Sequence, residues 1–290
     1  MFKGSGVALV TPFNQDLSIN YNELEKLIHF QIENSTDAII ICGTTGEAST
    51  LSEDEKKSLI KFTVNIVNNR VPVIAGTGSN NTKEAINLSR YAESCGANGL
   101  LIVTPYYNKC TQDGLYMHYK KISDNVNIPI ILYNVPTRTC VNIELDTVLK
   151  LSKIPNITGI KEASSNLSQI SNIIAKTNDD FYVYSGNDDQ ILPILSLGGN
   201  GVISVLANIF PKQTHDICFE FFNGNIESSR MLQFKYLDLC KKLFCEVNPI
   251  PIKEAMNMLD FNVGNCRLPL CSMNELNKKA LQEIINSLRR

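Results

Sequence analysis

Short apolar runs rich in valine and isoleucine recur along the chain, and each is followed by a segment with helical periodicity. The runs cover residues 7–10, 38–42, 71–75, 100–103, 128–133, 157–161, 181–184 and 202–206. Continuous apolar runs are typical of parallel strands that are covered on both faces. Eight such units in a chain of 290 residues predict an α/β protein with a closed (β/α)8 barrel, a TIM barrel. An open doubly wound sheet is the alternative.

The segments between the runs contain helix signals. Ser52 and Glu55 have the spacing of a capping box, and Gly96 is placed to end the helix that precedes it. After about residue 223 only helical periodicity remains. We therefore expect a catalytic barrel domain over residues 1–223 and a C-terminal helical subdomain over residues 224–290, packed on the barrel. Two prolines in the segment 248–251 predict an extended turn there.

Composition excludes several classes of function. The chain has 43% hydrophobic and 19% charged residues with a net charge of −2, which is typical of a globular protein and gives no electrostatic basis for nucleic-acid binding. The N-terminus lacks the pattern of a signal peptide, and no apolar stretch reaches the roughly 18 residues of a membrane span. We expect a cytoplasmic protein with no membrane partner.

The cysteines and histidines predict no metal site. Nine scattered cysteines without a Cys-x-x-Cys pair indicate reduced thiols, and the three histidines, His29, His118 and His215, are isolated from them and from each other. A glycine-rich phosphate fingerprint is also missing. We therefore expect no metal and no cofactor, so that the chemistry comes from side chains alone.

Lys161 is the most informative single residue, because it ends an apolar strand over residues 157–161. Desolvation of a lysine side chain favours its neutral amine, which can attack a ketone and form a Schiff base. The alternative is a lysine that extends to solvent or pairs with Glu162. Tyr133 ends another apolar run and Arg138 follows in the adjoining loop, so an acid/base and an anion-binding group are also present.

In barrels of this kind, the loops that follow the strands form the active site. After the second strand comes the turn 43–47, in which Thr44 and Thr45 offer hydroxyl and N–H groups to an anion. A solvated turn is the alternative. Tyr106 and Tyr107 follow the fourth strand, and Gly186 follows the seventh. These groups are expected to meet in one pocket around Lys161.

Four motifs together closely resemble the dihydrodipicolinate synthase family, nearly from end to end. They are Gly43-Thr44-Thr45-Gly46-Glu47, Tyr133-Asn134-Val135-Pro136-x-Arg138, Gly159-Ile160-Lys161-Glu162 and Asn248-Pro249-Ile250-Pro251. The first and third also fit the wider superfamily of pyruvate-dependent lyases and aldolases. Arg138 and the Asn-Pro-Ile-Pro segment favour the synthase over N-acetylneuraminate lyase or ketodeoxygluconate aldolase. A non-catalytic module that binds keto acids and a scaffold protein are alternatives of other classes.

The resemblance implies a lyase that condenses pyruvate with L-aspartate 4-semialdehyde to 4-hydroxy-tetrahydrodipicolinate, in diaminopimelate and lysine biosynthesis, without a cofactor. Lys161 would form the Schiff base with pyruvate, and Tyr133 would carry the proton. Thr44 would link Tyr133 to Tyr107, which the family takes from a neighbouring subunit. The chain is thus expected to form a homo-oligomer, a tetramer.

The resemblance also assigns the binding residues. Thr45 would hold the pyruvate carboxylate, and Arg138 would hold the semialdehyde carboxylate with its planar guanidinium. Gly186 and the carbonyl of Ile203 would line the Lys161 side of the pocket.

Members of the family that lysine inhibits have an allosteric pocket at a subunit interface. Asn80, Glu84 and Tyr106 agree with its pattern, whereas Glu53 and Lys56 replace histidines of well-known inhibited members. Because the Lys56 ammonium would repel a lysine effector, we expect weak or absent inhibition by lysine.

Overall fold

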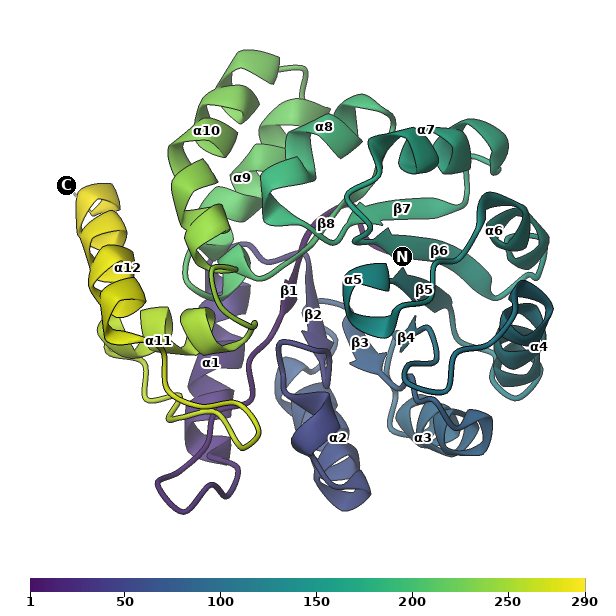
Figure 1. The fold of residues 1–290 in the computed structure, drawn as a ribbon, viewed down its shortest axis with the longest axis horizontal. Helices are drawn as coiled ribbons and strands as arrows, with labels where there is room; N and C mark the ends of the chain where they lie inside the picture. The colour runs from purple at the N-terminus through teal and green to yellow at the C-terminus, as the bar shows by residue number, and fades with distance from the viewer. Residues whose placement is uncertain (290) are drawn as a thin grey trace.

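In the computed structural model, which describes residues 1–289, eight parallel strands close into a barrel in the order of the chain (Figure 1). The strands are β1 (Gly4–Ala8), β2 (Ala38–Ile41), β3 (Val73–Gly76), β4 (Gly99–Val103), β5 (Ile130–Asn134), β6 (Ile157–Glu162), β7 (Tyr182–Ser185) and β8 (Gly201–Ser204). The predicted barrel is confirmed, and the open doubly wound sheet is wrong.

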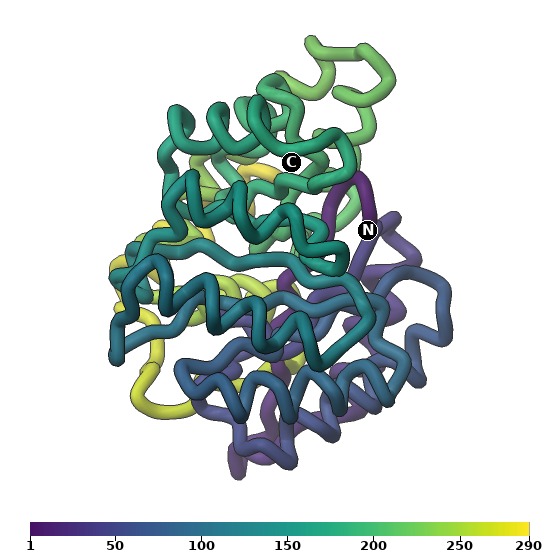
Figure 2. Tube along the Cα trace, turned by 90° about the vertical axis from the view of Figure 1, so that its right-hand side faces the viewer, coloured from purple at the N-terminus to yellow at the C-terminus, as the bar shows by residue number. Residues whose placement is uncertain are grey.

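Helices follow the strands, and most of them lie on the outside of the barrel, whereas the short α5 lies over its end (Figure 1). They are α1 (Tyr21–Glu33), α2 (Glu53–Val67), α3 (Thr82–Ser94), α4 (Gln112–Ser123), α5 (Pro136–Thr139), α6 (Leu145–Leu151), α7 (Leu167–Lys176), α8 (Ile191–Ser196), α9 (Pro211–Phe222), α10 (Ile226–Lys242), α11 (Ile250–Met258) and α12 (Glu275–Leu288). Seen from the side, α3, α4, α6 and α7 lie one after another along the barrel wall (Figure 2). The predicted capping box of Ser52 and Glu55 is present at the start of α2. Within residues 1–289, every helix is too short or too polar to cross a bilayer.

The barrel closes where β1 pairs with β8. Gly4 lies opposite Gly201, which has a φ of +148°. A Cβ on Gly201 would lie 1.9 Å from the carbonyl oxygen of Gly4, so only glycine allows the two backbones to approach this closely. The first strand begins at Gly4 rather than at the predicted Val7, because its small residues do not form an apolar run.

The strands carry apolar side chains on both faces, as predicted for parallel strands. An inner cluster fills the barrel and includes Ile40, Ile74, Leu101 and Ile131. The outer cluster joins the opposite face of the strands to the helices. Each such side chain contributes roughly 1.5–3 kcal/mol when it is fully buried.

The C-terminal helices share the outer cluster of the barrel. Leu281 and Ile285 of α12 are fully buried in it, and in Figure 1 α10, α11 and α12 lie together on one side of the barrel. The predicted extended turn at residues 248–251 is wrong at its end, because α11 begins at Ile250. Pro251 is accommodated since the first turn of a helix needs no N–H donor there.

Candidate active site

Lys161 and Tyr133 lie side by side at the ends of β6 and β5. They are direct partners in the register of the two strands, and Nζ of Lys161 lies 4.5 Å from the centre of the Tyr133 ring. Lys161 is only 6% exposed and Tyr133 only 7%. A lysine that extends to bulk solvent is therefore wrong, and the ammonium instead faces the electron-rich ring at cation–π distance.

Glu162 does not pair with Lys161. Its buried carboxylate accepts hydrogen bonds from Asn134, from the backbone N–H of Ser164 and from Gln169. Successive side chains of a strand point to opposite faces, so Lys161 and Glu162 are directed to different sides of β6.

Lys161 opens on a cavity of about 190 Å³. Six of the residues predicted for the site line it: Thr44, Thr45, Tyr133, Arg138, Lys161 and Gly186. An adjoining cavity of about 310 Å³ shares Thr44, Tyr133 and Arg138 with the first and extends to Lys56 and Tyr106. The side chains come from four separate loops and strand ends, as predicted for the rim of a barrel.

The turn 43–47 presents hydrogen-bond donors to this cavity. The N–H groups of Gly46 and Glu47 donate to the carbonyls of Gly43 and Thr44 within the turn. Among the described residues, the N–H groups of Thr44 and Thr45 have no acceptor. Successive N–H groups that are free within a tight turn can donate to an anion, so this turn is suited to an anion.

Asn248, from the segment before α11, joins the two groups predicted to bind carboxylates. Its side-chain amide donates to Oγ1 of Thr45 over 3.0 Å, and its backbone carbonyl accepts from Nη2 of Arg138 over 3.3 Å. Asn248 is 5% exposed and lines the cavity. Sequence reasoning recognised Asn248 only as part of a motif, since a contact between residues 203 positions apart has no local signal.

The comparisons with known proteins cover the whole barrel and its C-terminal helices. The model of the dihydrodipicolinate synthetase family matches residues 1–288. The chain belongs to the dihydrodipicolinate synthetase family. The 4-hydroxy-tetrahydrodipicolinate synthase 1 of Clostridium acetobutylicum is 59% identical over 282 residues, which cover 97% of this chain and 96% of that protein.

Solved structures of dihydrodipicolinate synthases have the same fold. The enzyme from Aquifex aeolicus superposes with a TM-score of 0.97 at 44% identity, over 99% of this chain and 98% of that one. A chloride-inhibited enzyme from Acinetobacter baumannii in complex with pyruvate superposes with a TM-score of 0.98 at 42% identity, over 100% and 99% of the two chains.

Two residues that the dihydrodipicolinate synthase resemblance assigns to the site lie outside both cavities. Tyr107 is 95% exposed, with a φ of +67° that is unusual for a tyrosine. Ile203 is fully buried in the inner apolar cluster, to which Tyr133 on β5 also belongs. A single chain of this family member therefore brings Thr44 and Tyr133 together but leaves Tyr107 pointing outward.

Of the three residues assigned to an allosteric pocket of the family, Asn80 and Tyr106 lie on neighbouring loops and Glu84 lies in the first turn of α3. Nδ2 of Asn80 donates to the carbonyl of Tyr106 over 3.1 Å, and Tyr106 lines the larger cavity. Glu84 accepts from Ser79 and Asn81 at the start of α3. Lys56 lines the same cavity as Tyr106, whereas Glu53 pairs with Lys57.

Asp188 is a buried carboxyl near the site to which sequence reasoning gave no role. Its Oδ2 accepts from the N–H groups of Val205 and Leu206 at 3.0 Å each. Burial raises the pKa of Asp188, while these hydrogen bonds and the charge of Lys161 act to lower it. This family member thus has an acidic group within electrostatic range of the Lys161 ammonium.

Proposed function

We propose that the protein condenses pyruvate with L-aspartate 4-semialdehyde to 4-hydroxy-tetrahydrodipicolinate. The observation that carries this proposal is the buried Lys161 amine, which lies against Tyr133 and beside a turn with two N–H donors that have no acceptor among residues 1–289. This arrangement suits a 2-keto acid, because its carboxylate fits the turn while its ketone meets the amine. The names of two relatives that are 59% and 58% identical to this chain, both 4-hydroxy-tetrahydrodipicolinate synthases, agree with this reaction.

The first half of the reaction activates pyruvate. Nζ of Lys161 attacks the ketone carbon, and loss of one water gives an iminium ion. The positive charge of the iminium allows the methyl group to lose a proton, which leaves an enamine nucleophile. The Tyr133 hydroxyl is the proposed proton carrier, since its ring lies against the Lys161 side chain.

The second half forms the carbon–carbon bond. The enamine carbon attacks the aldehyde of the semialdehyde, and the resulting alkoxide takes up a proton. The amino group of the semialdehyde then displaces Lys161 from the iminium carbon and closes the ring. The amine of Lys161 is regenerated, so the net reaction releases one water and needs no cofactor.

The two substrate carboxylates are assigned to different groups. Thr45 and the N–H groups of its turn would hold the pyruvate carboxylate, with Gly186 and the Ile203 carbonyl on the Lys161 side. Arg138 would hold the semialdehyde carboxylate, because it lies on the outer rim of the cavity on α5.

We infer that the working form is a homotetramer in which Tyr107 completes the relay of a neighbouring subunit through Thr44. The high exposure of Tyr107 and its constrained backbone support this role. The proposed division is a barrel domain over residues 1–223 and a helical subdomain over residues 224–290, with its boundary at the short turn between α9 and α10. A role in amino-acid biosynthesis is the reason to expect a cytoplasmic protein.

Reduction with borohydride in the presence of pyruvate tests the proposal. A pyruvate adduct on Lys161 in the intact protein, located by mass spectrometry, supports the enzyme. Lys161→Ala should abolish the adduct and lower turnover by several orders of magnitude, whereas Arg138→Ala should keep the adduct but impair use of the semialdehyde. Reversible binding without an adduct would instead indicate a keto-acid-binding module. An adduct followed by turnover of N-acetylneuraminate or ketodeoxygluconate alone would indicate another aldolase.

A further inference from the structure

Lys253 is a second buried lysine, on α11, and it lines neither active-site cavity. It is 2% exposed. Its ammonium donates to Oε1 of Glu47 over 2.9 Å, to the carbonyl of Thr11 over 3.1 Å and to the carbonyl of Asn265 over 2.9 Å. Nζ also lies 4.3 Å from the centre of the Phe13 ring. One ammonium therefore connects the loop after β1, the turn after β2 and the C-terminal segment.

Glu47, the partner of Lys253, is the last residue of the turn that carries Thr44 and Thr45. Its side chain is 0% exposed, and its φ of +57° lies in the left-handed region. Its N–H donates to the carbonyl of Thr44 over 3.0 Å. A shift of the Glu47 carboxylate would therefore move the Glu47 backbone and, through this hydrogen bond, the backbone of Thr44.

Thr11 provides a second connection to the same turn. Its hydroxyl donates to the carbonyl of Gly46 over 2.7 Å, and its own carbonyl accepts from Lys253. The ammonium of Lys253 consequently fixes the turn from two sides.

We propose that Lys253 is a positioning residue that holds the turn 43–47 so that Thr45 and the unpaired N–H groups face the pyruvate carboxylate. This inference rests on the proposed function. A buried ion pair is costly to desolvate and is weak support for stability alone. The ion pair of Lys253 and Glu47 lies next to the carboxylate-binding turn. Its proposed role is therefore to fix the positions of Thr44 and Thr45.

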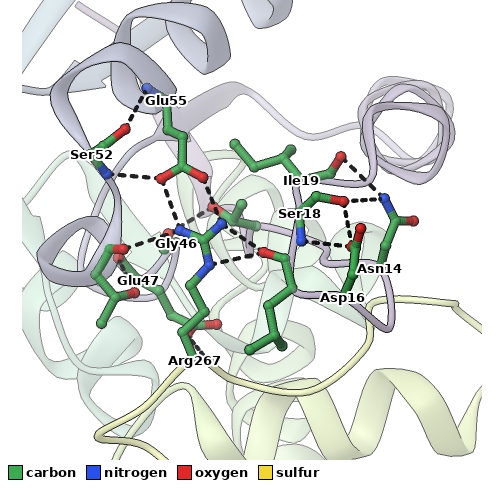
Figure 3. A network of polar contacts seen from close by, with 12 residues as sticks. Asn14, Asp16, Ser18, Ile19, Gly46, Glu47, Ser52, Glu55 and Arg267 are labelled. Carbon is green, nitrogen blue, oxygen red and sulfur yellow. Dashed lines mark hydrogen bonds and ion pairs between the residues drawn. The ribbon is translucent and has the colours of Figure 1, made fainter.

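Arg267 provides a matched control within the same network (Figure 3). Its guanidinium lies 4.3 Å from the same Phe13 ring, but its side chain bonds Glu55 at the start of α2 and the carbonyls of Leu17 and Thr50. Only its backbone N–H contacts Glu47. Loss of the Arg267 side chain should therefore weaken the fold without displacing Thr45.

The experiment compares Lys253→Met, Glu47→Gln, the double variant and Arg267→Met in the intact protein. Steady-state kinetics and borohydride trapping on Lys161 give the concentration of pyruvate at half-saturation, and thermal unfolding shows which variants are folded. We expect Lys253→Met and Glu47→Gln each to raise the KM for pyruvate about tenfold or more, with less than about a threefold change in the KM for the semialdehyde. Arg267→Met should lower the Tm and leave the KM for pyruvate within about twofold of the parent.

The double variant removes both charges and leaves no unpaired buried ion, so it can be measured even if Lys253→Met does not fold. Its KM for pyruvate should equal that of Glu47→Gln, because both substitutions break the same connection. A folded double variant with the parent KM would overturn the proposal, as would an equal rise in Arg267→Met. Absence of any adduct in the parent protein would instead refute the proposed function.

Discussion

Lys161 and Tyr133 are paired directly across the β5–β6 ladder, so the strand register itself brings the amine and the phenol together. The contact uses the face of the ring, with Nζ 4.5 Å from its centre. The ring and the hydroxyl of Tyr133 can therefore be tested separately, because the ring supports the lysine while only the hydroxyl can carry a proton.

Tyr133→Phe keeps the ring and removes the hydroxyl. Because general acid–base catalysis by one side chain contributes about 10²- to 10⁴-fold, kcat should fall within that range. The fold should be unchanged, and the protein should still bind pyruvate. Stopped-flow measurement of Schiff-base formation and the steady-state kcat provide the test. A kcat within about threefold of the parent would remove Tyr133 from the relay.

Tyr107 can be tested by mixing inactive subunits. Tyr107→Phe and Lys161→Ala should each be nearly inactive alone. If Tyr107 acts in the site of a neighbour, hybrid oligomers contain sites in which an intact Lys161 receives an intact Tyr107. Unfolding and refolding the two variants together should then restore a measurable part of the parent activity.

Two controls apply to the mixing experiment. The same variants refolded separately and combined afterwards at low temperature should remain inactive. Co-refolding of Tyr133→Phe with Lys161→Ala should give no recovery, because both residues belong to the same chain's cavity. Recovery only in that second mixture would contradict the assignment of Tyr107.

Much of the fold follows from local patterns in the sequence. The apolar runs at residues 38–42 and 157–161 predicted strands to within one residue, because a strand buried on both faces has no polar interruption. The first strand begins at Gly4, three residues before its predicted start at Val7, because Gly4, Ser5 and Gly6 are small rather than apolar. Their role depends on the close approach of Gly4 to Gly201, a contact that no local pattern contains.

The candidate site was predictable where a residue type is unusual in its surroundings. A lysine at the end of an apolar strand attracts attention, and so does a Thr-Thr pair between glycines. Asn248 and Lys253 gave no comparable signal, because their roles depend on contacts with Thr45 and Glu47 about 200 positions away. The prolines of the Asn-Pro-Ile-Pro motif predicted a turn, whereas its asparagine makes the contact with Thr45.

Lysine should be a poor inhibitor of this protein. Lys56 lines the cavity next to Tyr106, and its ammonium opposes the binding of a second one. We expect an inhibition constant on the order of 1 mM or weaker. Lys56→His should strengthen inhibition, whereas Lys57→His serves as the control because Lys57 pairs with Glu53 and lines neither cavity. A sub-millimolar constant for the parent, measured at saturating pyruvate, would contradict the prediction.

His118 should make the fold sensitive to acid. Its ring is buried between α4 and α3, with Nδ1 2.9 Å from Oγ1 of Thr82 and Nε2 without a partner among the described residues. Burial lowers the pKa of His118 from 6.5 to about 4. Between these two values the unfolded chain binds a proton that the folded chain does not, so stability is lost as the pH falls from 6.5 to 4. The full shift corresponds to about 3 kcal/mol of unfolding free energy.

His118→Gln should reduce this acid sensitivity, since glutamine does not titrate. The measurement is the free energy of unfolding in urea from pH 7.5 to 4.5, taken as the difference between variant and parent so that other groups cancel. His215→Gln is the informative comparison, because the hydrogen bond to Asp37 raises the pKa of His215. Protonated His215 stabilises the fold at low pH, and this contribution is lost as the pH rises through its folded pKa. Its removal should therefore steepen the loss of stability in acid, and identical slopes for the two variants would show that neither histidine governs it.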